Sequence, residues 1–265
     1  MIPTIGIEGT VMGNTKVKTV EKALAIIEYL LKSEEEKSIT NIAKNLKINT
    51  STVQRIVNTL HGEHYLFQNP LDRKYKLGLK FLEINRNILN DIDLRRIAAP
   101  YLKELRDQTK ETVNLMILDG IEGVYIDAVE GLYKTRAVTS IGTRDNLYYS
   151  AVGKAILAYF PDNKIESMFK VKGLSKTTHK TITNLNLLKK ELEKIRRQGY
   201  SIDDEEAEVG TRCIGVPIFN HDGKVTSSVS ISAPCHRLTE EKLNAFIPLL
   251  LNTGRVISEK IGYKN

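Results

Sequence analysis

Three serines in the C-terminal half of the chain are the first candidates for chemistry. Ser228, Ser230 and Ser232 alternate with Val229 and Ile231. Because successive side chains of a β-strand point to opposite faces, a strand here would carry its three hydroxyls on one face. Those hydroxyls could donate hydrogen bonds to a bound molecule, or they could face solvent at the edge of a sheet. The alternation by itself leaves both interpretations open.

Asp203 and Cys213 are the other polar candidates in this half of the chain. Cys213 could act as a nucleophile, or the two residues could form an acid–base pair. However, no histidine is placed near Cys213 by the sequence, and a buried structural thiol is the commoner state of a free cysteine. His179, His221 and His236 fit no metal-ligand spacing. We therefore expect no catalytic residue, no metal site and no cofactor.

A second group of residues, from Thr40 to Val57, has the pattern of a helix-turn-helix. Ala43 is small where two helices must cross closely, and Ile48 can fill the turn between them. Lys47 stands at the turn position that glycine often holds, where a left-handed backbone would cost about 1–2 kcal/mol. An ordinary helical hairpin with a polar outer face is the alternative interpretation.

The outer face of the second of these helices carries groups that suit DNA. Arg55 can form paired hydrogen bonds with guanine and Gln54 with adenine when the helix lies in a major groove. Thr50 and Ser51 lie beside free backbone amides and suit phosphate, and Asn49 or Thr50 is expected to cap the helix. The predicted DNA contacts of this helix are Thr50, Ser51, Thr52, Gln54 and Arg55.

Two short extended segments follow, at 65–68 and 74–77, and the residues between them favour a β-turn. Arg73, Lys74 and Lys76 would make this hairpin a basic wing beside the helix. The window 37–80 holds eight basic and two acidic residues, so its net charge of +6 is nearly all of the +7 of the chain. A winged helix-turn-helix with this charge predicts double-stranded DNA as a partner, with Arg73 and Lys74 on phosphate or in the minor groove.

Periodicity divides the chain into regions. Residues 1–15 are expected to be a mobile tail, 16–77 a winged helix-turn-helix domain, 78–92 a linker helix and 93–265 a second domain. The first domain should have helices at 17–31, 40–46 and 51–61. The second should have helices at 94–109, 151–159, 185–198 and 239–260, and strands at 112–118, 124–128, 135–140, 213–219 and 225–233. The last two strands flank Asp222-Gly223, a strong hairpin signal. This order predicts an α+β domain with an antiparallel sheet.

The composition narrows the class of protein. Of 265 residues, 41% are apolar, which is enough for cores in two domains. No apolar run reaches the roughly 18 residues of a membrane span, and the first residues lack the pattern of a secretory signal. Cys213 and Cys235 are too few for a disulfide framework. We therefore expect a cytoplasmic protein with no membrane partner.

Spaced motifs in both halves are shared with a known family. They are Ser51-Thr-Val-Gln-Arg55, Asp72-Arg-Lys-Tyr-Lys-Leu-Gly78, Ala151-Val-Gly-Lys-Ala155, Gly199-Tyr-Ser-Ile-Asp-Asp-Glu-Glu206, Gly210-Thr-Arg-Cys-Ile214 and Ser228-Val-Ser-Ile-Ser-Ala-Pro234. From Lys16 onward the chain resembles the IclR family of bacterial transcription regulators. The resemblance implies an N-terminal winged helix-turn-helix, a linker helix and a C-terminal GAF/PAS-like effector-binding domain. It also implies homodimers, or dimers of such dimers, on a DNA operator.

The resemblance further implies a pocket for a small organic acid or a related metabolite. The positions that carry over are Ala151, Gly153, Asp203, Cys213, Ser230 and Ser232. Amides and hydroxyls would donate to the ligand oxygens. Asp203 would accept from a ligand hydroxyl or a bridging water, because an ionised carboxylate cannot hold a bare carboxylate. A DNA-binding dimer with a non-functional pocket and a small-molecule enzyme using Cys213 remain the alternatives. The sequence does not distinguish a repressor from an activator.

Overall fold

The computed structural model describes residues 17–91 and 93–264, which form two compact units. The boundary between the units falls between Ile88 and Leu89, inside the helix α4 (Lys80–Asp91). This helix lies within the predicted linker at 78–92. The tail predicted at 1–15 lies outside the described residues.

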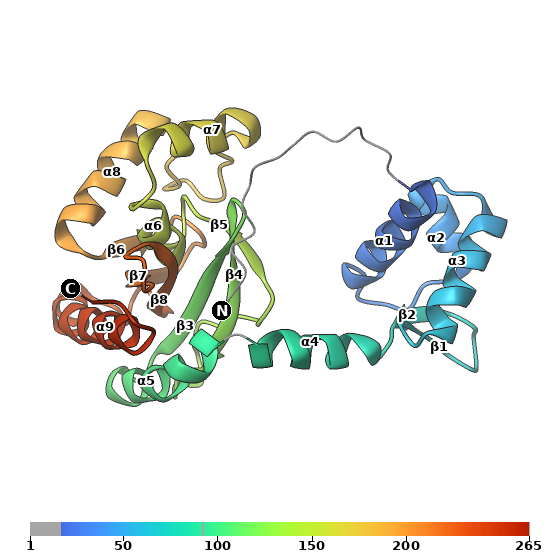
Figure 1. Ribbon diagram of the computed structural model, residues 1–265, viewed down its shortest axis with the longest axis horizontal. Coiled ribbons are helices and arrows are strands. Elements are labelled where there is room, and N and C mark those ends of the chain that lie inside the picture. Colours follow the sequence, from blue (N-terminus) through green and yellow to red (C-terminus); the bar gives the residue numbers. More distant parts are fainter. Residues whose placement is uncertain (1–16, 92, 265) are drawn as a thin grey trace. The chain divides into compact units, whose positions relative to one another are not determined.

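The first unit is a helical body with a short hairpin (Figure 1). Its elements are α1 (Lys18–Leu31), α2 (Ile39–Leu46), α3 (Thr50–Gly62), β1 (Leu66–Gln68) and β2 (Tyr75–Leu77). The two strands pair antiparallel, and the core between helices and hairpin comprises Ile26, Leu30, Ile42, Ala43, Val53, Ile56, Val57, Leu66 and Tyr75. These apolar positions recur at three- and four-residue steps within each helix, which is why each helix buries one face.

The turn between α2 and α3 has the backbone that the motif requires. Lys47 adopts a left-handed conformation with φ 55°, and the Ile48 amide donates to the Ala43 carbonyl at 3.1 Å. Ser38, not foreseen from the sequence, caps α2 by accepting from the Asn41 amide at 3.2 Å. The predicted side-chain cap of α3 is wrong: Asn49 occupies the cap position, but its side chain accepts no hydrogen bond there.

The second unit is built on one six-stranded sheet. Its elements in chain order are α5 (Asp93–Thr109), β3 (Thr112–Asp119), β4 (Glu122–Val129), β5 (Arg144–Asn146), α6 (Ala151–Leu157), α7 (Asp162–Lys172), α8 (Leu185–Gln198), β6 (Ser201–Asp204), β7 (Thr211–Phe219), β8 (Val225–Pro234) and α9 (Glu240–Lys260). The strand order is β5-β4-β3-β8-β7-β6, and all neighbours are antiparallel. The predicted α+β class with an antiparallel sheet is confirmed.

Helices cover both faces of this sheet (Figure 1). Helices α5 and α9 pack on one face over alternate residues such as Val113, Ile214 and Ile231. Helix α6 packs on the other face, with α8 and α7 outside it. Ser228, Ser230 and Ser232 lie on the α6 side of the central strand β8, where each is at least 94% buried. The interpretation that they face solvent is therefore wrong.

The structure corrects other parts of the predicted element order. The strand predicted at 135–140 is absent, and these residues belong to a connection before the short strand β5. Instead of pairing in a ladder, the segment is held by Thr112, whose Oγ1 donates to the Ala137 carbonyl at 2.6 Å. Helix α7 and the strands β5 and β6 were not predicted.

Candidate functional site

Helix α3 exposes the polar face that the sequence predicts. Ser51, Gln54 and Arg55 are exposed, whereas Val53 and Ile56 are buried in the core of the first unit. The Gln54 side chain donates to the Asn58 carboxamide oxygen at 2.9 Å. The guanidinium of Arg55 contacts no acidic group among the described residues. Thr50 begins the helix and is exposed, and Thr52 is half-buried.

The hairpin β1–β2 and its turn at 69–74 form the wing of this unit. Arg73 is exposed in the turn and has a left-handed backbone with φ 60°. Lys74 forms an ion pair with Asp72 at 2.7 Å. The two predicted DNA contacts of the wing, Arg73 and Lys74, therefore differ in their surroundings. Lys74 has an acidic partner within the turn.

The second unit contains a polar cavity of about 400 Å³ between the sheet, the start of α6 and the connection before β5. Five of the six positions suggested for an effector line it. The lining comprises Tyr125, Ala137, Val138, Thr139, Ser140, Thr143, Arg144, Asp145, Tyr149, Ser150, Ala151, Val152, Asp203, Ala207, Glu208, Thr211, Cys213, Ser230 and Ser232. Four separate segments of the chain therefore contribute to one site.

Strand register explains why these residues meet. Asp203 of β6 is the register partner of Cys213 of β7, which is in turn the partner of Ser232 of β8. Ser232 is paired with Thr112 of β3. Directly paired residues on adjacent strands project from the same face, so these side chains form one row across the sheet.

Gly153 does not line the cavity. It lies where α6 passes the backbone of Leu147 so closely that a Cβ would stand 2.6 Å from the Leu147 Cα. Gly153 therefore fixes the position of the helix. Ala151 lies at the cavity, and its carbonyl accepts the Ser201 hydroxyl at 2.6 Å. The first-turn amides of Ala151 and Val152 have no intrahelical partners, because no carbonyl lies one turn before them in the helix.

Asn114, which was not predicted from the sequence, contacts two of the serines that line the cavity. From β3 its side-chain amide donates to Ser232 Oγ at 3.0 Å and to Ser230 Oγ at 3.4 Å. Asn114 is 98% buried, and its Oδ1 has no hydrogen-bond partner among the residues that the structure describes. A single asparagine inside an apolar strand gives no periodic signal, so its role emerges only when the strands are paired.

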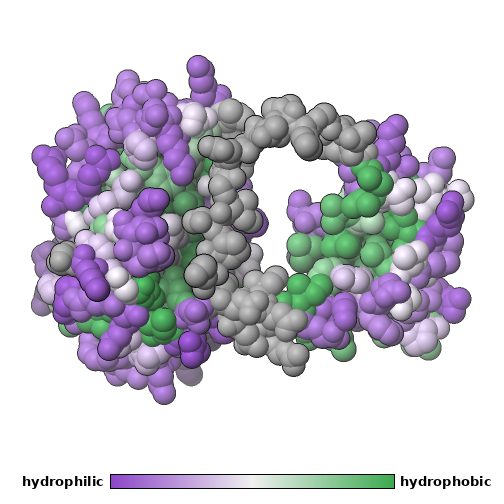
Figure 2. All heavy atoms as spheres, viewed as in Figure 1, coloured by the Kyte–Doolittle hydropathy of each residue, from purple (hydrophilic) through white to green (hydrophobic). Residues whose placement is uncertain are grey.

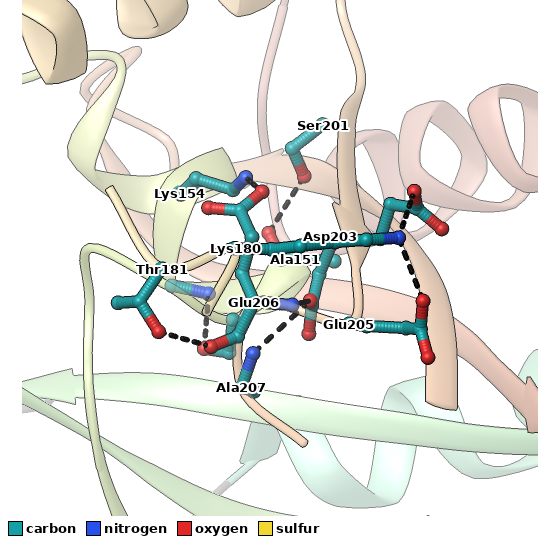
Figure 3. A network of polar contacts seen from close by, with 12 residues as sticks. Ala151, Lys154, Lys180, Thr181, Ser201, Asp203, Glu205, Glu206 and Ala207 are labelled. Carbon is teal, nitrogen blue, oxygen red and sulfur yellow. Dashed lines mark hydrogen bonds and ion pairs between the residues drawn. The ribbon is translucent and has the colours of Figure 1, made fainter. Parts of the chain in front are cut away.

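A polar network holds Asp203, which lines the cavity (Figure 3). Its Oδ1 accepts from the amides of Glu206 and Ala207 at 2.7 and 3.2 Å. The Glu206 side chain is paired with Lys154, which is fully buried in α6. The Glu206 carbonyl accepts the Thr181 hydroxyl at 2.7 Å. The loop that carries Asp203 is therefore fixed to both α6 and the segment before α8.

Burial sets the protonation of the polar groups in the cavity. Desolvation raises the pKa of Asp203 to about 7, although Lys154 and the two amides act against it. Near neutral pH this carboxyl can thus carry a proton and donate a hydrogen bond. Desolvation and the neighbouring Asp203 raise the pKa of the Cys213 thiol well above its ordinary value. The thiolate that a nucleophile requires is disfavoured.

Another part of the cavity wall carries Tyr125, Asp145 and Tyr149, which were also missed. Tyr125 Oη donates to Asp145 Oδ2 at 3.4 Å, and burial raises the pKa of Asp145. Arg144 at the same wall forms an ion pair with Glu122 at 3.6 Å and another with Asp119. The part of the chain that the structure describes has no cluster of three or more His, Cys, Asp or Glu side chains suited to a metal ion.

A winged helix-turn-helix followed by a separate sheet domain with a polar cavity defines a DNA-binding regulator with an effector domain. Residues 19–70 match the IclR helix-turn-helix domain, and residues 86–259 match the C-terminal domain of bacterial IclR transcriptional regulators. The chain belongs to the IclR family, as its motifs predicted. None of the helices within 17–91 and 93–264 is long and apolar enough to cross a membrane.

Full-length relatives support the assignment. The chain is 36% identical to the HTH-type transcriptional regulator KdgR of Escherichia coli, covering 93% of this chain and 94% of KdgR. It is 34% identical to the regulator XynR of the same organism, covering 93% and 98%. The crystal structure of the Thermotoga maritima IclR protein superimposes with a TM-score of 0.78 at 37% identity, covering 93% of this chain and 99% of that one.

Proposed function

We propose that this protein binds a specific DNA operator through α3 and the wing, and that a small organic acid in the cavity of the second unit modulates that binding. The observation that carries the sensing part is the convergence of Asp203, Cys213, Ser230 and Ser232 on one cavity of about 400 Å³. A cavity of this size suits a small metabolite. The hydroxyl and carboxyl groups that line it can form hydrogen bonds with the oxygens of a ligand.

The chemistry of the lining supports an acid that also carries a hydroxyl or keto oxygen. Hydroxyls of Ser230 and Ser232 and the first-turn amides of α6 can donate to ligand oxygens. Asp203 can accept from a ligand hydroxyl or a bridging water while ionised, and can donate while protonated. The charges of Asp145 and Glu208 in the lining disfavour a highly charged anion.

The DNA-binding unit is proposed to act as a pair. Helix α1 exposes Val20, Leu24 and Leu31 at steps of four and seven residues, so they share one face. Leu79 and Leu82, near the start of α4, are also exposed. Figure 2 shows apolar surface gathered over α1. A second copy of the chain that covers this apolar face would give a two-fold dimer. Such a dimer suits a near-palindromic operator. We expect it to act in the cytoplasm.

Two measurements test the proposal. Small hydroxy and keto acids are first screened for an increase in the melting temperature of the purified protein, because a ligand that binds only the folded state stabilises it. Affinity for an operator selected from a random duplex pool is then measured with and without the stabilising acid. Stabilisation together with a changed DNA affinity is expected. DNA binding without stabilisation by any acid would refute sensing and favour a non-functional pocket.

A further inference from the structure

Glu36, between α1 and α2, contacts the wing at two points. Its Oε2 accepts from the Asn69 side-chain amide at 2.8 Å, and its Oε1 lies 2.8 Å from the Lys76 ammonium. Asn69 directly follows β1, whereas Lys76 is the middle residue of β2. One carboxylate therefore joins the two strands of the wing to a segment 33 residues before Asn69.

The backbone next to Glu36 is attached to the wing as well. Lys37 and Tyr75 exchange two hydrogen bonds, with N···O distances of 2.9 and 2.8 Å. The side chain of Glu36 is only 22% exposed. Its hydrogen bonds with Lys76 and Asn69 lower its pKa, so it carries a full charge at neutral pH. Glu36 is therefore an ionised group held in place beside the wing.

The three cations of the wing are not equivalent. Lys74 is paired with Asp72, and Lys76 is paired with Glu36 and lies over the Phe67 ring at 5.1 Å. Arg73 is exposed in the turn, and within the described part of the chain its guanidinium contacts no acidic group. Two of the three positive charges thus have an acidic partner, whereas Arg73 has none in the described part of the chain.

We propose that Glu36 is a positioning residue for DNA binding. It fixes the wing on the helical body and offsets the charge of Lys76. Arg73 is then the wing cation that contacts phosphate, and Lys76 is not. The proposal rests on DNA binding by this unit. It adds which cations of the wing are neutralised by an acid and which one is left to contact phosphate.

The salt dependence of binding to a random-sequence DNA duplex of about 30 base pairs measures how many cations of the protein contact phosphate. Each phosphate contact contributes about 0.9 to the slope of log K against log salt concentration. Arg73→Gln should reduce the slope by about 0.9 per subunit, and Lys76→Gln should leave it unchanged. Glu36→Gln should increase it by up to about 0.9, because Lys76 becomes free while an acceptor for Asn69 is retained.

Glu35→Gln is the matched control, because it removes the same charge from the neighbouring position. Glu35 is 86% exposed and its only ion pair among the described residues is with Lys37 at 3.7 Å, so its replacement leaves Lys76 paired with Glu36. The double variant Glu36→Gln, Lys76→Gln should return the slope to that of the wild type.

The proposal is overturned if Lys76→Gln reduces the slope as Arg73→Gln does, or if Glu36→Gln and Glu35→Gln give equal slopes. The comparison of Lys76→Gln with Arg73→Gln uses no Glu36 variant. It can therefore overturn the proposal even if Glu36→Gln fails to fold. A wild type that binds no duplex would refute DNA binding itself, which is a distinct result.

Discussion

The side-chain amide of Asn114 on β3 donates to the hydroxyl oxygen of Ser232 on β8 at 3.0 Å. The same amide also donates to Ser230 Oγ, at 3.4 Å. A serine oxygen that accepts from an amide keeps its own proton for another acceptor. Asn114 therefore leaves both hydroxyl protons available to the oxygens of a ligand, which suits an organic acid.

Replacing Ser230 and Ser232 together by alanine should weaken binding of the stabilising acid by about 0.5–1.5 kcal/mol for each hydrogen bond lost. DNA affinity without the acid should hardly change. Calorimetric titration of wild type and variant measures the difference. Equal affinities would move the effector site to another part of the protein.

Ser228→Ala is the matched control for that experiment. Ser228 lies on the same face of β8, but its hydroxyl donates to the Val152 carbonyl at 2.8 Å. Its removal should lower the free energy of unfolding by roughly 1 kcal/mol and leave the affinity for the acid unchanged. The pair of variants thus separates the binding of a ligand from the attachment of α6 to the sheet.

Asp203 should make the stability of the second unit depend on pH. Its pKa is about 7 in the folded protein, against about 3.9 for the free side chain. Between these values the folded state holds a proton that the unfolded state releases. The free energy of unfolding should therefore fall as pH rises from about 4 to about 7, and this contribution is constant at higher pH.

Asp203→Asn keeps an acceptor oxygen for the Glu206 and Ala207 amides but cannot titrate. Urea unfolding at a series of pH values should show a smaller decline for this variant than for the wild type. Parallel curves for the two proteins would mean that Asp203 has an ordinary pKa.

The loss of stability caused by breaking the buried pair of Lys154 and Glu206 should be recovered when the second charge is also removed. Lys154→Met leaves the Glu206 carboxylate without its partner and should cost about 3–5 kcal/mol of stability. Adding Glu206→Met replaces both charges by apolar groups and should recover much of that loss. If the double variant is no more stable than Lys154→Met, the charge of Glu206 is not what destabilises the single variant.

The sequence was most informative where burial is periodic. In the first unit the apolar steps of α1, α2 and α3 identified the helices within about one residue at each end. In β8 the alternation of serine with valine and isoleucine identified the polar face correctly. It did not reveal that this face is buried, because burial depends on α6, which lies some 70 residues earlier in the chain.

The misassigned strand at 135–140 has a related cause. Thr135, Val138 and Thr139 favour extended structure, but strand formation depends on a partner edge as much as on residue type. This segment is instead held through Ala137 and lines the cavity. Its misassignment also concealed the wall that contains Asp145.

Long-range polar contacts were the least predictable. Asn114 and Ser230 are separated by 116 residues, and Asn69 and Glu36 by 33. The basic window counted from the sequence began at Lys37, one residue after Glu36. The fold places that acid against Lys76, so the charge of the wing is lower than the local count implied.

The pairing of two DNA-binding units should depend on the exposed face of α1. Leu24, which is 57% exposed, lies in the middle of that face. Leu24→Glu would bury a charge in the proposed contact and should weaken self-association and operator binding together. Lys18→Gln, outside the stripe on the same helix, makes the same change in charge and is the control. Sedimentation and fluorescence anisotropy measure the two effects, and an unchanged dimer in Leu24→Glu would exclude this face.

Arg55 should be a determinant of sequence specificity. It is exposed on α3, has no acidic partner among the described residues and is not part of the core. Arg55→Ala should therefore weaken binding to the selected operator by about 1–3 kcal/mol and leave the melting temperature nearly unchanged. Binding to a random duplex should fall much less, because that binding reflects phosphate contacts. Gel-shift titrations with both duplexes provide the comparison. An operator affinity equal to that of the wild type would show that α3 does not read the bases through Arg55.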